Sequence, residues 1–281
     1  MPAFPFAVLA GDTPEGEIGV LSRYVSRVVL LPPDESTAEP VSRHPDMNFA
    51  VVGNTLVTHE RYYRTARAEI DEICTLGGFR LMLSTMDRGA DYPRDIGFNA
   101  LILNALILNA PILSALTFDG PADPASVCPL AVVGKTGSLS PELLALAEEA
   151  GMEQISVKQG YAACSAAVFG SAVHGSALVC TADKGIAEAC ERLGCTVLRI
   201  PQNTGIALPG YDCGFIGGAS GYWDGRAFFF GNPLLHPALA PLCTALDARG
   251  IEVVPLSEGR LTDRGGIRIF RMAEAGNSCN M

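Results

Sequence analysis

Two stretches of the chain repeat one pattern of apolar segments about 50 residues apart, and this repeat constrains the fold most. The first stretch begins at Gly160–Tyr161 and the second at Gly210–Tyr211. In each, two apolar segments precede a segment with helical spacing, and a glycine and a last apolar segment follow it. A repeat of this length indicates a ring or an array of small units, because one unit cannot bury its apolar face alone.

The two repeats predict the same order of strand, strand, helix and strand. The stretch 160–201 predicts strands over 164–170, 176–183 and 195–201, with a helix over Lys184–Leu193. The stretch 210–257 predicts strands over 213–218, 226–232 and 251–257, with a helix over His236–Arg249. Gly194 and Gly250 directly follow the two helices, where a glycine commonly ends a helix.

The same order appears earlier in the chain. Residues 46–86 predict a hairpin of strands 48–52 and 55–58, a helix over Glu60–Leu76 and a strand over 79–85. Residues 95–159 predict strands over 98–103, 105–109, 130–135 and 154–159, with a helix over Pro141–Ala150. Ser140 stands directly before that helix and is a favourable N-cap residue.

The two ends of the chain each hold part of one more unit. Residues 265–270 read as a lone strand, whereas Glu17–Arg27 reads as a helix and 28–32 as a strand. We therefore expect 258–270 and 5–32 to complete a fifth unit together, with 271–281 as a flexible tail. The prediction is an α/β protein of five ββαβ units, forming a single domain over 1–281.

Composition limits the classes of partner. Of the residues, 48% are hydrophobic and 18% charged, which suits a fold with thick buried layers. The net charge is −10 without a cluster of Lys or Arg, so we expect neither nucleic acid nor an anionic membrane surface as partner. Nine cysteines occur without a CxxC pair, which favours a reducing, cytoplasmic location.

Five ββαβ units, the last closed by the two termini, resemble the pentein superfamily. That fold is the five-bladed α/β propeller, with pseudo-fivefold symmetry, of enzymes that modify guanidine groups. The chain also resembles an uncharacterised bacterial family of that fold, through the phrases HPDMNF, YPRDIGFN, VKQGYAACS and GYDCGFIGGASG.

The pentein resemblance implies a cysteine nucleophile, a proton-transferring histidine and acidic residues that hold a cationic substrate. Arg94–Asp95 resembles the RD motif of arginine deiminases, whose aspartate clamps the guanidinium. The HxD motif of the fourth unit falls on Gly210 and Asp212, so its histidine is missing. The GGxHC motif of the last strand places Ile269 where the cysteine should be. The resemblance therefore leaves both usual catalytic positions empty.

Other residues are candidates for a site at the ring centre. Cys164 is the candidate relocated nucleophile, with Lys158 nearby to lower the pKa of its thiol; the alternative is a small buried side chain. The candidate ligand-binding residues are Arg94, Asp95, Asn99, Lys158, Tyr211, Asp212 and Asp263. We expect no cofactor and no metal, because the histidines lack the spacing of metal ligands and fit surface or helix-cap positions. The histidines are His44, His59, His174 and His236.

Three functions remain open at this point. The preferred one is a protein that binds a small polar, cationic or amino-acid-like ligand in a central cavity, without the usual Cys and His machinery. The second is a hydrolase or amidinotransferase-like enzyme that uses Cys164. The third is a structural or interaction protein. The sequence determines neither the ligand nor the oligomeric state.

Overall fold

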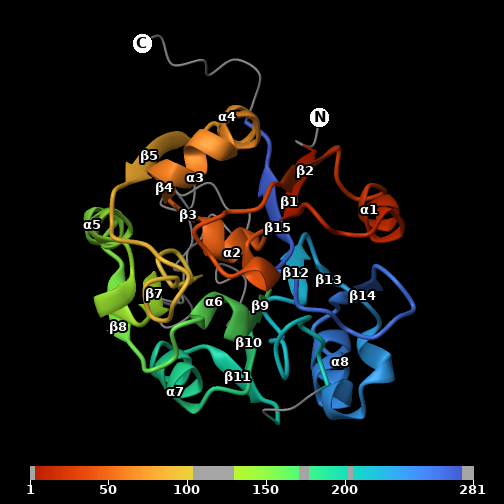
Figure 1. Cartoon of the computed structure of the whole chain (residues 1–281). Helices are drawn as coiled ribbons and strands as arrows, with labels where there is room; N and C mark the ends of the chain where they lie inside the picture. The colour runs from red at the N-terminus through yellow and green to blue at the C-terminus, as the bar shows by residue number, and fades with distance from the viewer. Residues whose placement is uncertain (1–3, 104–129, 171–176, 202–204, 274–281) are drawn as a thin grey trace, which may run out of the picture.

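Each unit of the repeat folds as one three-stranded sheet with its helices on the outside (Figure 1). The computed structural model describes residues 4–103, 130–170, 177–201 and 205–273. The strands of the first three units are β3 (Phe49–Val52), β4 (Thr55–His59), β5 (Arg80–Ser84), β6 (Leu101–Leu103), β7 (Ala131–Gly134), β8 (Glu153–Ser156), β9 (Ala166–Phe169), β10 (Leu178–Thr181) and β11 (Thr196–Arg199). Those of the other two units are β12 (Ser220–Trp223), β13 (Arg226–Phe229), β14 (Glu252–Pro255), β15 (Arg268–Arg271), β1 (Pro5–Ala10) and β2 (Arg27–Leu31).

The helices lie between the second and third strand of each unit or directly before the first. The former are α1 (Glu15–Leu21), α3 (Glu60–Thr65), α4 (Arg67–Gly77), α5 (Pro141–Glu149), α7 (Lys184–Arg192) and α8 (Ala240–Asp247). The one-turn helices α2 (Pro45–Asn48) and α6 (Ala162–Ser165) precede β3 and β9. Short 3-10 turns are η1 (Glu39–Val41), η4 (Thr136–Ser138), η5 (Pro233–Leu235) and η6 (Pro237–Leu239). No helix of the described ranges is long and apolar enough to cross a membrane.

All five sheets share one topology, which confirms the predicted fold class. The first two strands of a unit pair antiparallel, and the third pairs parallel to the second after the helical crossover. In the fifth sheet β15 pairs antiparallel with β1, and β2 pairs parallel with β1, in the order β15-β1-β2. The two ends of the chain therefore complete one unit, as the sequence predicts.

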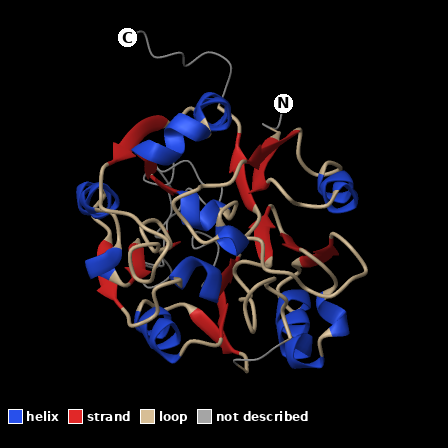
Figure 2. Ribbon diagram, viewed as in Figure 1, coloured by secondary structure: helices blue, strands red, loops and turns tan. Residues whose placement is uncertain are grey.

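The sheets form a ring with the helices α1, α4, α5, α7 and α8 at its periphery (Figure 2). Five apolar clusters hold the ring together, and each lies between two neighbouring units. The cluster with Phe6, Phe49 and Leu56, for example, joins the fifth unit to the first. Because every pair of neighbours shares a cluster, each unit buries its apolar face against the next.

Local sequence explains where several elements begin and end. The hydroxyl of Ser140 accepts a hydrogen bond from the N–H of Leu143 at 3.3 Å and caps α5 as predicted. Gly194 and Gly250 follow α7 and α8 with φ of 76° and 65°, a left-handed conformation that favours glycine. The caps and glycines therefore fix the limits of these helices.

One predicted strand differs from the structure, and another lies where the structure gives no description. The segment 213–218 is not a strand, and the first strand of the fourth unit is β12. Gly217 and Gly218 lie in a turn where a Cβ on Gly217 would overlap with the backbone carbonyl oxygens of α6, so the chain turns there instead of extending. The predicted strand 105–109 lies outside the described residues, and β6 pairs with β7.

Three boundaries are also corrected. The predicted strand over 164–170 begins at Ala166, because Ala162–Ser165 form the helix α6. The predicted helix over Glu60–Leu76 is two helices separated at Ala66. β15 continues to Arg271, one residue into the segment predicted as a tail, and the part of that segment beyond residue 273 lies outside the described residues.

Candidate functional site

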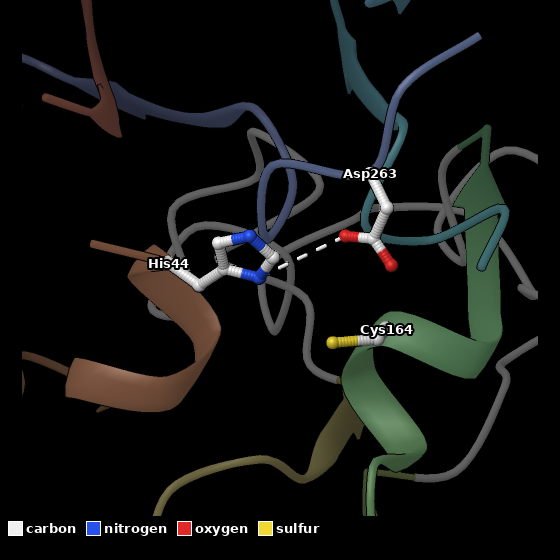
Figure 3. A group of neighbouring side chains, drawn as sticks. All are labelled: His44, Cys164 and Asp263. Carbon is white, nitrogen blue, oxygen red and sulfur yellow. Dashed lines mark ion pairs between the residues drawn. The ribbon is translucent and has the colours of Figure 1, made fainter. Parts of the chain in front are cut away.

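Three chemically active side chains meet at the centre of the ring, although they belong to three different units. His44 precedes α2, Cys164 lies in α6 and Asp263 lies in the loop before β15. Figure 3 shows that the imidazole, the thiol and the carboxylate point toward one another. The nitrogen, sulfur and oxygen ligand atoms all lie within 4.8 Å of one another, and all three residues are buried.

A second aspartate brings a carboxylate into direct contact with the thiol. Cys164 Sγ donates a hydrogen bond to Oδ2 of Asp46 at 2.6 Å. Asn99 holds the thiol from the other side, because its amide Nδ2 donates to Sγ at 3.1 Å. The carbonyl Oδ1 of Asn99 accepts from the N–H of Ala163 at 2.9 Å and so fixes the first turn of α6. The position of the sulfur is therefore determined by two side chains from two other units.

Asp263 is paired with His44 and anchored by the backbone. His44 Nδ1 lies 3.8 Å from Oδ1 of Asp263. The N–H groups of Gly265 and Phe215 donate to the two carboxylate oxygens of Asp263 at 3.0 and 2.9 Å. A carboxylate held in this way keeps its orientation, so it can orient the imidazole that faces it.

Burial and the two carboxylates decide which groups of the cluster carry charge. Burial, the charges of Asp46 and Asp263 and the hydrogen bond to Asp46 raise the pKa of the Cys164 thiol well above its usual value. Burial raises the pKa of Asp263 to about 6, against the lowering effect of the His44 charge and the two backbone hydrogen bonds. Lys158 is exposed, so the predicted lowering of the thiol pKa by this lysine is wrong. The raised pKa of the Cys164 thiol favours its protonated form near neutral pH.

Several atoms of the cluster are buried without a hydrogen-bond partner among the described residues. They are Nδ1 of His44, Oδ1 of Asp46 and Oδ1 of Asn48. Buried polar atoms in folded proteins are nearly always hydrogen-bonded, so such atoms point to a ligand, an ion or water. The donor set of His nitrogen, Cys sulfur and Asp oxygen is also of the kind that binds zinc.

Asp46 connects the cluster to a cavity of about 120 Å³ at the centre of the ring. The first strands of the units form its walls, mostly with apolar side chains such as Phe49, Leu101 and Ile269. Among the described residues that line it, Asp46 and Arg268 are the charged ones. The cavity therefore offers space for a small molecule beside the Asp46 carboxylate.

A second buried polar group surrounds Asp95, near the cluster. Tyr161, the residue before α6, donates its hydroxyl to Oδ2 of Asp95 at 2.6 Å. The other oxygen of Asp95 has no hydrogen-bond partner among the described residues. Arg88 is fully buried, donates to Oδ2 of Asp34 at 2.7 Å and stacks over Phe98. Burial lowers the pKa of Arg88, whereas the charges of Asp34 and Asp95 raise it, so the two pairs are linked through their charges.

The structure separates the predicted site residues into two groups. Asn99, Cys164 and Asp263 are buried and share the central cluster. Asp95 is buried beside it. The remaining four have exposed side chains, with Arg94 paired to Asp91 and Asp87 at the surface. They are Arg94, Lys158, Tyr211 and Asp212.

Two residues of the cluster, His44 and Asp46, are absent from the sequence-based candidates. His44 is the N-cap residue of α2, in line with the expected cap position, but its buried side chain makes no capping hydrogen bond and faces Asp263 instead. A signal was present, since His44–Pro45–Asp46 has the His-x-Asp spacing that is missing from the fourth unit. The motif stands in the first unit instead.

Comparison with known proteins supports the fold. A model of a family of unknown function, DUF6873, matches residues 8–114 and 126–268. No curated protein matches the chain. Among solved structures, the chain resembles DDAH from Pseudomonas aeruginosa, crystallised as a cysteine-to-serine mutant in complex with citrulline. The TM-score is 0.52 at 11% sequence identity, over 96% of this chain and 100% of that one, which confirms the pentein fold.

Proposed function

Because the chain belongs to the family of unknown function DUF6873 and has the pentein fold, we propose that it binds a small cationic ligand at the ring centre and that Cys164 attacks this ligand. The observation that carries the proposal is the contact of 2.6 Å between the Cys164 thiol and the Asp46 carboxylate, next to the His44–Asp263 pair. A nucleophile beside a base, with a second acid–base pair within reach, is the arrangement that covalent catalysis needs.

The ligand class follows from the charges of the cluster. Asp46 and Asp263 place two carboxylates beside one thiol, and a planar amidinium or guanidinium satisfies two carboxylates through paired hydrogen bonds. The similar DDAH structure holds citrulline, whose ureido group has the planar shape of a guanidinium without its charge. We therefore favour an enzyme that uses Cys164 as a relocated nucleophile over a binding protein without catalytic groups.

The proposed reaction keeps each proton with a named group. The Cys164 thiol transfers its proton to Asp46, and the thiolate attacks the central carbon of the amidinium to form a tetrahedral adduct. The His44–Asp263 pair donates a proton to the departing nitrogen, and an ammonia or amine leaves. Water then attacks the thiol-bound carbon and gives one proton back to the His44–Asp263 pair. The carbon–sulfur bond breaks, Asp46 returns its proton to the sulfur and restores the thiol, and the second proton of water leaves with the released ammonia or amine.

The raised pKa of the Cys164 thiol fits this order of events. In the empty site the two carboxylates and burial keep the thiol protonated. A bound cation offsets the carboxylate charges, so it lowers the pKa of the thiol and generates the thiolate only when a ligand is present. The cluster therefore reacts with a cationic electrophile in preference to a neutral one.

A pair of alkylating reagents tests this preference. Chloroacetamidine carries an amidinium and iodoacetamide is neutral, and the reaction rate of each is divided by its rate with glutathione. We expect the normalised rate at Cys164 to be at least about tenfold higher for chloroacetamidine, since 1.4 kcal/mol of charge attraction produces that factor. Peptide mass spectrometry identifies the modified cysteine.

Matched variants make the labelling experiment specific. Cys164→Ser should abolish the modification of that peptide, and Asp46→Asn should lower the preference for the amidinium. Asp247→Asn removes an exposed carboxylate on α8 and should leave the preference unchanged. Equal normalised rates for the two reagents in the wild type would contradict the proposal.

A bound zinc ion is the second candidate function of the cluster. It is favoured by the mixed nitrogen, sulfur and oxygen donors within 4.8 Å and by Nδ1 of His44, which makes no hydrogen bond among the described residues. We would expect about one zinc per chain after dialysis against Zn²⁺, with loss in Cys164→Ser and His44→Asn. Zinc content that does not depend on Cys164 would exclude this candidate.

A further inference from the structure

The side chain of the residue after Asp263 pairs with a carboxylate on a peripheral helix. Arg264 lies in the loop before β15, and its side chain is 18% exposed. Its Nε lies 3.5 Å from Oε2 of Glu17, whose side chain is 8% exposed. Glu17 belongs to α1, the outer helix of the fifth unit (Figure 1). Neither of these two atoms makes a hydrogen bond among the described residues, so the ion pair compensates the charge of both.

Two further contacts hold this ion pair in place. Ser257, in the segment after β14, donates its hydroxyl to Oε1 of Glu17 at 2.8 Å. The guanidinium of Arg264 lies over the buried ring of Phe230, 5.9 Å from the centroid. A cation over the face of an aromatic ring is attracted by the ring. The ion pair therefore joins α1 of the fifth unit to two segments of the fourth.

The backbone of Arg264 belongs to the turn that holds the Asp263 carboxylate. The N–H of Arg264 donates to the carbonyl oxygen of Gly218 at 2.9 Å. The next residue, Gly265, donates its N–H to Oδ1 of Asp263 at 3.0 Å. A Cβ on Gly265 would overlap with both the backbone and the side chain of His44. The turn therefore packs directly against both members of the His44–Asp263 pair, and a displacement of the turn changes how they face each other.

We infer that the Glu17–Arg264 ion pair holds the Asp263 carboxylate in the orientation that faces His44, so that Glu17 and Arg264 are positioning residues of the site. The turn needs such support, because Gly265 has a φ of 74° and a glycine loses more conformational freedom on ordering than any other residue. The inference rests on the proposed function for its consequence, since the His44–Asp263 pair there donates the proton to the departing nitrogen.

Amide hydrogen exchange followed by NMR tests this support without any ligand. The amides of Arg264 and Gly265 report the turn, and the amide of Val179 in β10 reports the rest of the fold. In Glu17→Gln we expect the turn amides to exchange about tenfold faster or more, with Val179 unchanged, because a buried cation then lacks its partner. Arg264→Met should accelerate the Gly265 amide in the same way. Glu15→Gln removes an exposed carboxylate of the same helix and should change neither.

Alkylation of Cys164 connects the ion pair to the proposed reaction. The preference of Cys164 for chloroacetamidine over iodoacetamide should fall about 3- to 10-fold in Glu17→Gln and in Arg264→Met, the factor that one lost hydrogen bond produces. Arg264→Lys keeps the charge and should retain most of the preference. Adding Glu17→Gln to Arg264→Met should cause no further fall, because Glu17 acts through Arg264.

The outcomes distinguish this inference from the proposed function. Unchanged exchange of the Gly265 amide in Glu17→Gln and Arg264→Met would overturn the inference, and so would faster exchange with an unchanged labelling preference. A wild type without any preference for chloroacetamidine would reject the proposed function. The inference is then decided by the chemical shift of the Gly265 amide, which follows the ionisation of Asp263. The pH-dependent change of this shift should become smaller in Glu17→Gln, and an undiminished change would overturn the inference.

Discussion

Asp263 should make the stability of the folded protein fall as the pH rises from about 4 to about 6. The pKa of its carboxyl is raised from 3.8 to about 6, mainly by burial. Between these values the folded chain binds a proton that the unfolded chain has released, so the free energy of unfolding decreases with pH. Asp263 is 2% exposed, so solvent screening does not reduce this effect. The carboxylate is therefore retained at the cost of stability near neutral pH.

The size of the effect follows from the shift of the pKa. One unit of pKa difference corresponds to about 1.4 kcal/mol, so the full effect of the raised pKa of Asp263 is about 3 kcal/mol. About 2 kcal/mol of this falls between roughly pH 4.5 and 7.5, the range in which urea unfolding is practical. Other carboxyl groups also titrate in this range, so a variant must isolate the contribution of Asp263.

Urea unfolding of wild type and Asp263→Asn across this pH range provides the test. We expect the difference in unfolding free energy between the two proteins to change by about 2 kcal/mol, in favour of the variant at higher pH. Asparagine also loses one of the two acceptors for the N–H groups of Gly265 and Phe215, but this loss is the same at every pH. Asp247→Asn on the surface should show no such change. Parallel pH curves for wild type and Asp263→Asn would refute the reasoning.

Two further predictions concern groups that support the site. Arg88→Met should lower the free energy of unfolding by about 3 to 5 kcal/mol, because it leaves the Asp34 carboxylate buried without its cation. Adding Asp34→Asn to this variant should restore part of the lost free energy in urea unfolding. Additive effects of the two substitutions would contradict this account. Gly218→Ala should displace the carboxylate of Asp263, because the new Cβ would overlap with this carboxylate. The displacement should lower the preference of Cys164 for chloroacetamidine over iodoacetamide. The control Gly137→Ala, whose Cβ meets no neighbour within 4 Å, should leave this preference unchanged.

The ring itself could be predicted from the sequence, because its signals are local and repeated. Apolar segments of strand length, helical spacing and terminating glycines recur in each unit and lead to the observed sheet order. That the two ends of the chain complete one unit followed from counting the parts there, although the strand β1, which pairs with β15, was not among the predicted elements. Each of these signals depends on a few neighbouring residues, so none requires knowledge of the tertiary contacts.

The composition of the central cluster could not be predicted in the same way. Asp46 and Cys164 are 118 residues apart in the sequence, and no local spacing indicates that their side chains touch. Burial of Cys164 between two carboxylates also reverses the expected direction of its pKa shift. The His-x-Asp spacing at His44–Asp46 could have indicated two residues of the cluster, but the pentein resemblance places this motif in the fourth unit.

The pseudosymmetry of the ring explains how a site can move while the fold stays the same. Asn99, Cys164 and Gly218 each lie two residues before the first strand of their units, and Asp46 lies three before β3. These positions face one centre, so a thiol at any of them meets the side chains from the others. Cys164 of the third unit contacts Asp46, which lines the central cavity, and Ile269 of the last strand lines the same cavity. Under the proposed function, Cys164 in the third unit supplies the thiol, and the last strand does not need to supply one.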